Sequence, residues 1–169
     1  SLWPGNGPRS GTGMVKDVHS GASGSDMEFL TAAGSTLYFM ADDGTNGYEL
    51  WKSNGSTAGT VMVKDIYSGS GSSFPSNLTA VGSTLYFVAT DGTNGFELWK
   101  SDGTSSRTVM VKDIRSGSSG SDLDFLTAAG STLYSMAHDG TNGYELWKSY
   151  GSTAGTVMVK DIYSGSGSS

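Results

Sequence analysis

The sequence predicts an all-β fold made of repeated four-stranded units, and three observations support this prediction. A tetrapeptide returns at a constant spacing, turn residues interrupt the chain every 8–15 positions, and apolar and polar side chains alternate between the turns. Alternation with a period of two is the pattern of a half-buried strand. No stretch shows the 3.6-residue period of an amphipathic helix, so we expect the strands to follow one another as an antiparallel meander.

The repeat is 48 residues long. Glu-Leu-Trp-Lys occupies residues 49–52, 97–100 and 145–148, and both Val-Lys-Asp-Ile/Val and Gly-Ser-Thr-Leu-Tyr recur with the same step and without a gap. A constant period of this length indicates a repeat architecture. The chain therefore divides into a partial N-terminal half-unit and three complete units, at residues 1–25, 26–73, 74–121 and 122–169.

The units also alternate, which gives a longer period of 96 residues. Residues 145–169 match residues 49–73 at 24 of 25 positions, and the one difference places Tyr150 opposite Asn54. The first half of the third unit differs from that of the first unit at only four positions, whereas the middle unit differs more from both. Recent duplication of a pair of units, or design, would produce this pattern.

Each unit is expected to contain four short strands. In the middle unit they are predicted at residues 77–81, 83–90, 96–100 and 108–114, separated by glycine-containing turns. Four strands in 48 residues is the size of one blade of a β-propeller. We therefore predict a β-propeller-type array of four-stranded blades, with a regular β-solenoid as the alternative fold.

Two of the repeated strings resemble a known family. Glu-Leu-Trp-Lys-Ser-Asp-Gly-Thr at residues 97–104 and Asp-Asp-Gly-Thr-Asn-Gly-Tyr-Glu at residues 42–49 are similar to the ELWxxDGT tandem repeats of large bacterial surface proteins. The resemblance covers nearly the whole chain and departs from the pattern at Pro4, Asn6 and Pro8. It implies a propeller-like fold and an extracellular or cell-surface location, and it assigns no chemistry to any residue.

Composition removes several classes of function. The net charge of −6 and the pI near 4.6 disfavour nucleic acid as a partner, because an acidic surface repels phosphate. The absence of cysteine excludes disulfides, thiolate catalysis and cysteine-based zinc sites. No apolar run approaches the roughly 18 residues needed to cross a membrane, so membrane insertion is not expected.

The number of units bears on assembly. Three complete units and a surplus half are fewer than the roughly four blades at which a propeller closes. An open stack of blades exposes apolar faces and unpaired edges. We therefore expect either that copies of the chain join into a ring or a filament, or that these residues are a piece of a longer array.

An acidic turn recurs in every complete unit. Each copy begins with Asp-Gly-Thr-Asn-Gly and ends with Glu, so that an aspartate and a glutamate stand six residues apart, at Asp43 and Glu49, Asp91 and Glu97, and Asp139 and Glu145. Carboxylate oxygens are ligands that calcium accepts, so these pairs are candidate calcium sites. Asp-Gly and Asn-Gly are also the residues that tight turns require, and the alternating carboxylates of a full calcium loop are missing. No other cofactor is predicted.

One tryptophan per unit is the second candidate feature, at Trp51, Trp99 and Trp147. An exposed row of indole rings would suit sugar stacking and therefore glycan binding. A tryptophan on a strand also buries a large apolar area, so packing between units is the competing interpretation.

The remaining candidate residues are weaker signals. Asn54 and Asn77 match the acceptor pattern for N-glycosylation. His19 and His138 fall at different positions of the repeat, and no Gly-x-Ser-x-Gly elbow accompanies them, so no catalytic set is predicted and the chain is not expected to be an enzyme.

These observations favour a non-catalytic structural or adhesive repeat protein that assembles with copies of itself. The alternative is a lectin-like module that binds glycans in pockets between units. Growth into polymers without a ligand would favour the first function, and calcium-dependent glycan binding would favour the second.

Overall fold

A computed structural model describes residues 11–165, which form three separate four-stranded sheets and contain no α-helix. Sheet one comprises β1 (Glu28–Ala33), β2 (Thr36–Asp42), β3 (Tyr48–Ser53) and β4 (Val61–Lys64). Sheet two comprises β5 (Ser76–Val81), β6 (Thr84–Thr90), β7 (Phe96–Ser101) and β8 (Val109–Lys112). Sheet three comprises β9 (Asp124–Ala129), β10 (Thr132–His138), β11 (Tyr144–Ser149) and β12 (Thr156–Lys160). The all-β prediction is confirmed.

Within each sheet the strands pair antiparallel with their sequence neighbours, and each sheet lies inside one 48-residue unit. In sheet two, β5, β6 and β7 each begin and end within one residue of their predicted bounds. Strand β8 stops at Lys112 instead of residue 114. The strand ends early because the N–H of Ile114 donates to the carboxylate of Glu97 on β7 at 2.9 Å, and the chain leaves the sheet. A single 3-10 turn, η1 (Ser105–Arg107), precedes β8.

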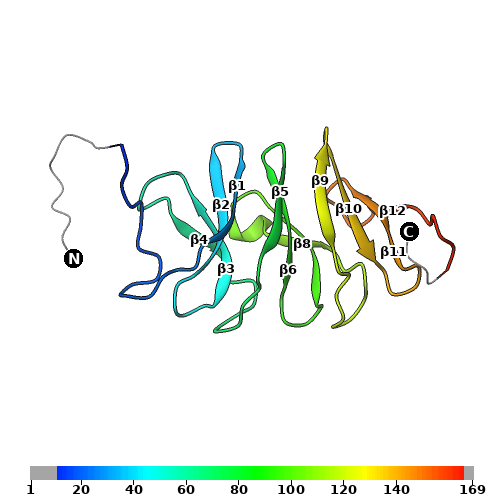
Figure 1. The fold of residues 1–169 in the computed structure, drawn as a ribbon, viewed down its shortest axis with the longest axis horizontal. Helices are drawn as coiled ribbons and strands as arrows, with labels where there is room; N and C mark the ends of the chain where they lie inside the picture. The colour runs from blue at the N-terminus through cyan, green and yellow to red at the C-terminus, as the bar shows by residue number, and fades with distance from the viewer. Residues whose placement is uncertain (1–10, 166–169) are drawn as a thin grey trace.

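The three sheets stand side by side along the long axis of the molecule (Figure 1). Their first strands, β1, β5 and β9, are neighbours in space although about 48 residues separate them in sequence. Threonine hydroxyls join them: Thr31 Oγ1 donates to the carbonyl of Leu78 at 3.3 Å, and Thr79 Oγ1 donates to that of Leu126 at 3.2 Å. The same bond thus repeats from each sheet to the next.

The apolar core lies between the sheets. Trp99 and Phe87 of sheet two pack with Leu50 and Val63 of sheet one, and an equivalent cluster joins sheets two and three. Strand β6 is consequently buried at almost every position, whereas β10 alternates between buried and half-buried residues. A sheet covered on both faces has continuous burial, and one covered on a single face alternates.

Residues 11–25 form no strand and pass over the outer face of sheet one. Val18 is buried there against Phe39, Ala41 and Trp51. This segment belongs to the predicted N-terminal half-unit, whose residues 1–10, including Pro4, Asn6 and Pro8, lie outside the described part of the chain. Between residues 11 and 165, no helix is long and apolar enough to span a membrane.

Candidate functional site

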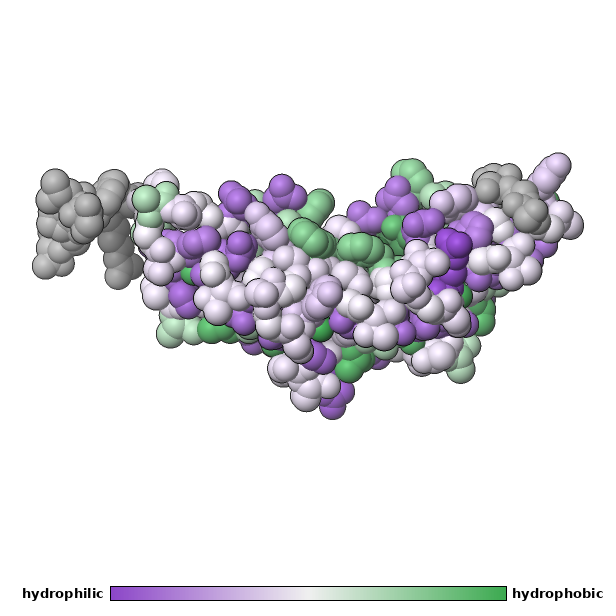
Figure 2. Space-filling view, turned by 90° about the horizontal axis from the view of Figure 1, so that it is seen from below, coloured by the Kyte–Doolittle hydropathy of each residue, from purple (hydrophilic) through white to green (hydrophobic). Residues whose placement is uncertain are grey.

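The first strands of the three sheets line a hollow of about 290 Å³. Figure 2 shows a depression in one edge of the molecule, with apolar side chains gathered in it. Each sheet contributes three consecutive residues to the lining: Phe29, Leu30 and Thr31; Asn77, Leu78 and Thr79; Asp124, Phe125 and Leu126. The sequence analysis did not predict this hollow.

A backbone irregularity shapes the lining. Phe29, Asn77 and Phe125 stand at equivalent positions of the repeat, and each has a left-handed φ between 52° and 57° at a break in strand register. Such a conformation is strained for a residue other than glycine and marks a β-bulge here. Phe29 and Phe125 remain 43% and 69% exposed, so their rings are accessible at the hollow.

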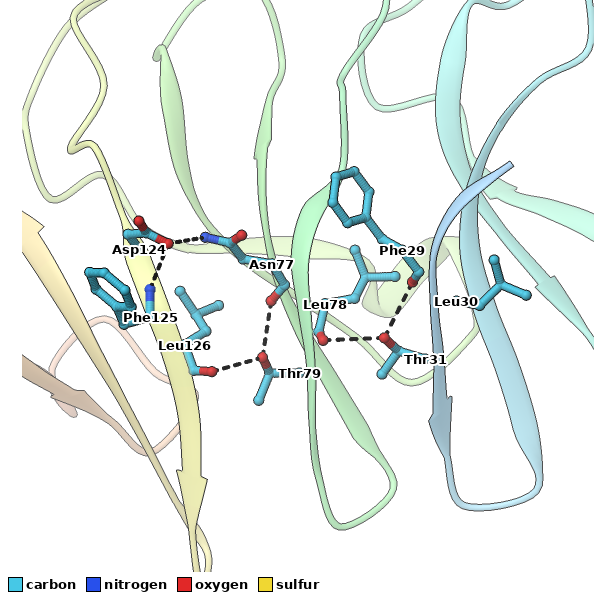
Figure 3. A pocket seen from close by; sticks show the side chains of 9 residues that line it. All are labelled: Phe29, Leu30, Thr31, Asn77, Leu78, Thr79, Asp124, Phe125 and Leu126. Carbon is cyan, nitrogen blue, oxygen red and sulfur yellow. Dashed lines mark hydrogen bonds between the residues drawn. The ribbon is translucent and has the colours of Figure 1, made fainter. Parts of the chain in front are cut away.

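Polar groups lie between the two phenylalanine rings (Figure 3). The Asn77 amide donates to Asp124 Oδ1 at 3.1 Å and to the carbonyl of Leu123 at 3.3 Å. Aromatic rings beside an amide and a carboxylate are the residue types that small-molecule sites combine. The sequence does mark this hollow through the alternation of its units, because the middle unit has asparagine where both neighbours have phenylalanine.

Each complete unit also contains a fully or almost fully buried glutamate, which is the second half of the predicted calcium pair. Glu97 Oε2 accepts hydrogen bonds from the Ile114 N–H and from Ser121 Oγ at 2.9 and 2.7 Å, and Oε1 accepts one from the Arg115 N–H. Glu49 binds the equivalent groups of Ile66, Tyr67 and Ser73, and Glu145 accepts from the N–H of Ile162. The glutamate therefore fastens the Ser/Gly loop after the fourth strand to the third strand.

The aspartate of each pair has a different role. Asp91 Oδ1 accepts the N–H groups of Thr93 and Asn94, and Oδ2 accepts the Asn94 amide. Partial burial raises the pKa of Asp91, but these hydrogen bonds outweigh it and hold the pKa below its usual value. The same contacts recur at Asp43 and Asp139.

The two carboxylates of a pair thus face separate sets of donors. Among residues 11–165, no three or more His, Cys, Asp and Glu side chains come together in an arrangement that could hold a metal ion. Calcium binding would require both side chains to release N–H donors and turn toward each other.

Burial raises the pKa of Glu97 to about 7, against the opposing effect of its hydrogen bonds, and shifts the pKa of Glu49 in the same direction. Between about pH 4.5 and 7, the Glu97 carboxyl therefore keeps its proton in the folded chain, whereas in the unfolded chain it loses that proton near its ordinary pKa of 4.5. Stability from this group is complete below pH 4.5 and is lost as the pH rises through 7.

We expect the contribution of Glu97 to the free energy of unfolding to fall by roughly 2 kcal/mol between about pH 5.5 and 8, at 1.36 kcal/mol per pKa unit. Urea unfolding at the two pH values, in the wild type and in Glu97→Gln, measures the contribution of Glu97. The variant should show the weaker pH dependence. Equal dependence in both proteins would contradict the raised pKa. The turn aspartates do not interfere, because their lowered pKa values place their titration below this range.

The three predicted tryptophans are each 6% exposed. Trp99 and Trp147 lie between neighbouring sheets, whereas Trp51 lies under residues 11–25 on the outer face of sheet one. A lysine from the preceding unit covers each ring: Lys16, Lys64 and Lys112 place Nζ at 5.8, 6.0 and 5.5 Å from the ring centroids of Trp51, Trp99 and Trp147. Each ammonium also donates to a threonine carbonyl at 2.8–2.9 Å, on Thr60, Thr108 and Thr156. These rings serve as packing between units, and a sugar could stack on them only if the covering sheet, or residues 11–25 in the case of Trp51, moved away.

The other predicted residues are dispersed. Asn54 lies on an exposed turn, where its Oδ1 accepts from Ser56, so its amide is accessible for glycosylation. The Asn77 amide is half-buried and donates within the hollow. The His19 ring lies against Gly44, and His138 Nδ1 accepts the N–H of Gly140. In the described part of the chain, neither histidine is hydrogen-bonded to a serine or a carboxylate.

Comparisons with protein-family models, with curated proteins and with solved structures found no match to this chain.

Proposed function

We propose that this chain is a non-catalytic, extracellular structural repeat protein that assembles with copies of itself, its sheets being the blades of a propeller-type array. The supporting observation is an uncovered apolar face at the end of sheet three. There Leu146, Val159 and Ile162 are 41%, 45% and 61% exposed. The equivalent residues of sheets one and two are at most 7% exposed, because the next sheet covers them.

This face consists of the same residue types that form the core elsewhere in the molecule. Burying them removes apolar surface from water, at about 25 cal/mol per Å². An exposed patch that continues a packed core marks an interaction surface rather than an ordinary solvated one. A further sheet of the same kind fits it by repetition, which supports assembly from identical chains.

A second candidate function is glycan binding, and the hollow between the first strands favours it. Phe29 and Phe125 present exposed rings beside Asn77 and Asp124, a combination suited to a sugar with one apolar face and several hydroxyl groups. This site differs from the predicted one, because the tryptophans have no part in it.

Mass measurement in solution separates the two candidates. We expect light scattering over a dilution series to give an average mass above the 17.5 kDa of one chain that rises with concentration, with rings or fibres in negative-stain images. A mass of 17.5 kDa at every concentration would contradict self-assembly. A monomer that binds to a glycan array would support the second candidate.

A further inference from the structure

We infer that copies join head to tail, with sheet three of one chain packing on sheet one of the next in the place that residues 14–19 now occupy. We call residues 14–19 the N-terminal cap. This inference rests on the proposed self-assembly and specifies its interface. It follows from contacts that recur between successive units and stop at the two ends of the stack.

The first recurring contact belongs to the fourth strand. Lys64 and Lys112 each donate to a threonine carbonyl of the next sheet and lie over its tryptophan ring. Lys160 is the equivalent residue of sheet three. Within residues 11–165 it makes neither contact, and its side chain is exposed. A tryptophan ring and a threonine carbonyl from one more sheet would give Lys160 the two contacts that Lys64 and Lys112 make.

The second recurring contact belongs to the third strand. Lys52 Nζ donates to the carbonyl of Gly103 at 2.7 Å, and Lys100 Nζ donates to that of Gly151. Lys148 is the equivalent residue in sheet three, where its ammonium lies 5.6 Å from the ring of Tyr150. Sheet three therefore carries two ammonium groups and an apolar face that all suit one more sheet.

Sheet one carries the matching surface. Trp51 and the carbonyl of Thr60 correspond to the groups that receive Lys64 and Lys112, and Gly55 corresponds to Gly103 and Gly151. Leu30 is 61% exposed, whereas the equivalent Leu78 and Leu126 are packed against the cores between sheets. A sheet placed before sheet one would bury Leu30 in the same way.

The N-terminal cap fills part of this surface. Lys16 makes the contacts of the fourth-strand lysine, and Val18 occupies the place of Ile66 and Ile114. Thr57 Oγ1 also donates to the carbonyl of Val15 at 2.7 Å. The cap therefore makes the edge contacts of a preceding unit, and its own residues form no strand.

A second copy supplies more contacts than the cap does. Pro4 stands at the repeat position of Lys148, and a proline side chain has no ammonium group to donate to the carbonyl of Gly55. Ile162 is larger than Val18 at the equivalent position, and sheet three would also cover Leu30. The cap is tethered and hence present at high effective concentration. Exchange of the cap for a second copy should thus depend on protein concentration.

Opposite ends of the chain meet in this contact, so it is heterologous. A heterologous contact produces a ring if the rotation between copies closes and an open filament if it does not. Both products conserve the same interface.

Sedimentation velocity over a concentration series tests this interface with four variants. Val18→Glu and Lys16→Ala both weaken the binding of the cap to sheet one. Lys16→Ala does so without changing a buried apolar residue. Ile162→Glu places a charge on the exposed face of sheet three, where a side chain already 61% exposed tolerates substitution. Ser106→Glu adds the same charge on an exposed loop of sheet two and serves as the control.

We expect the cap variants to lower the concentration of half-assembly by roughly tenfold, because a larger fraction of chains is competent to bind. Ile162→Glu should raise that concentration at least about tenfold, and Ser106→Glu should match the wild type. Circular dichroism establishes that each variant is folded.

Three negative results have different meanings. If the wild type assembles and Ile162→Glu assembles equally well, this interface is wrong and the proposed function stands. If Lys16→Ala assembles at the same concentration as the wild type, the inference that the second copy displaces the cap is wrong. If the wild type and both cap variants remain monomers at every concentration, the proposed function itself fails.

Discussion

Replacing Glu97 with alanine is expected to lower the free energy of unfolding by about 3–5 kcal/mol. The substitution removes the acceptor for three hydrogen bonds, two of which lie in the buried interior with Ile114 and Ser121 as donors. A buried donor without a partner costs about 1–3 kcal/mol. The loop after β8 also loses its anchor to β7, which adds to the loss.

Urea denaturation followed by near-ultraviolet circular dichroism measures this effect. Glu28→Ala is the matched control, because Glu28 has the same side chain on an exposed position. Glu97→Gln should lie between the two, since its amide keeps one acceptor oxygen and turns an N–H group toward the loop donors. If Glu97→Ala lost no more stability than the control, the loop-fastening role of this carboxylate would be wrong.

Trp99→Ala is expected to destabilise the protein by about 3–5 kcal/mol, the usual loss for truncating a buried aromatic residue. The ring packs with Leu50, Val63 and Phe87 between sheets one and two, and Lys64 lies over it. Truncation leaves a cavity at the boundary between two units and removes the surface on which the ammonium rests.

Trp99→Phe separates the packing of the ring from its polar group. Among residues 11–165, the buried indole N–H of Trp99 has no hydrogen-bond partner. Phenylalanine retains most of the apolar contact and removes this unsatisfied donor, so we expect a smaller loss, about 1–2 kcal/mol. Equal losses for alanine and phenylalanine in urea denaturation would contradict the packing role. Sugar binding that disappears in both variants would instead support a stacking role.

The sequence predicted the strands well because each has its own local signal. Alternating residues in β6 and the glycine turns on either side define that strand without reference to the rest of the chain. The end of β8 was predicted two residues too late, because it depends on Glu97, a residue of a different strand. This contact joins residues 17 positions apart on different segments, so the alternation of side chains within one strand does not reveal it.

The candidate sites were harder to predict for a related reason. The Asp-Gly-Thr-Asn-Gly-Tyr-Glu string suggested one site with two carboxylates. In the structure Asp91 caps its own turn, whereas the Glu97 side chain reaches a loop 17 to 24 residues later in the chain. The hollow requires three first strands to meet, and no single unit contains it. Only the difference between Asn77 and the flanking phenylalanines marked its position.

The lysine contacts between units also affect how the number of repeats encoded by such a gene can change. Lys16, Lys64 and Lys112 make the same contacts to three successive sheets. Unequal recombination that inserts or removes 48 codons therefore joins two surfaces that already fit, and no compensating mutation is needed at the new junction. Array length can therefore vary in evolution by single genetic events.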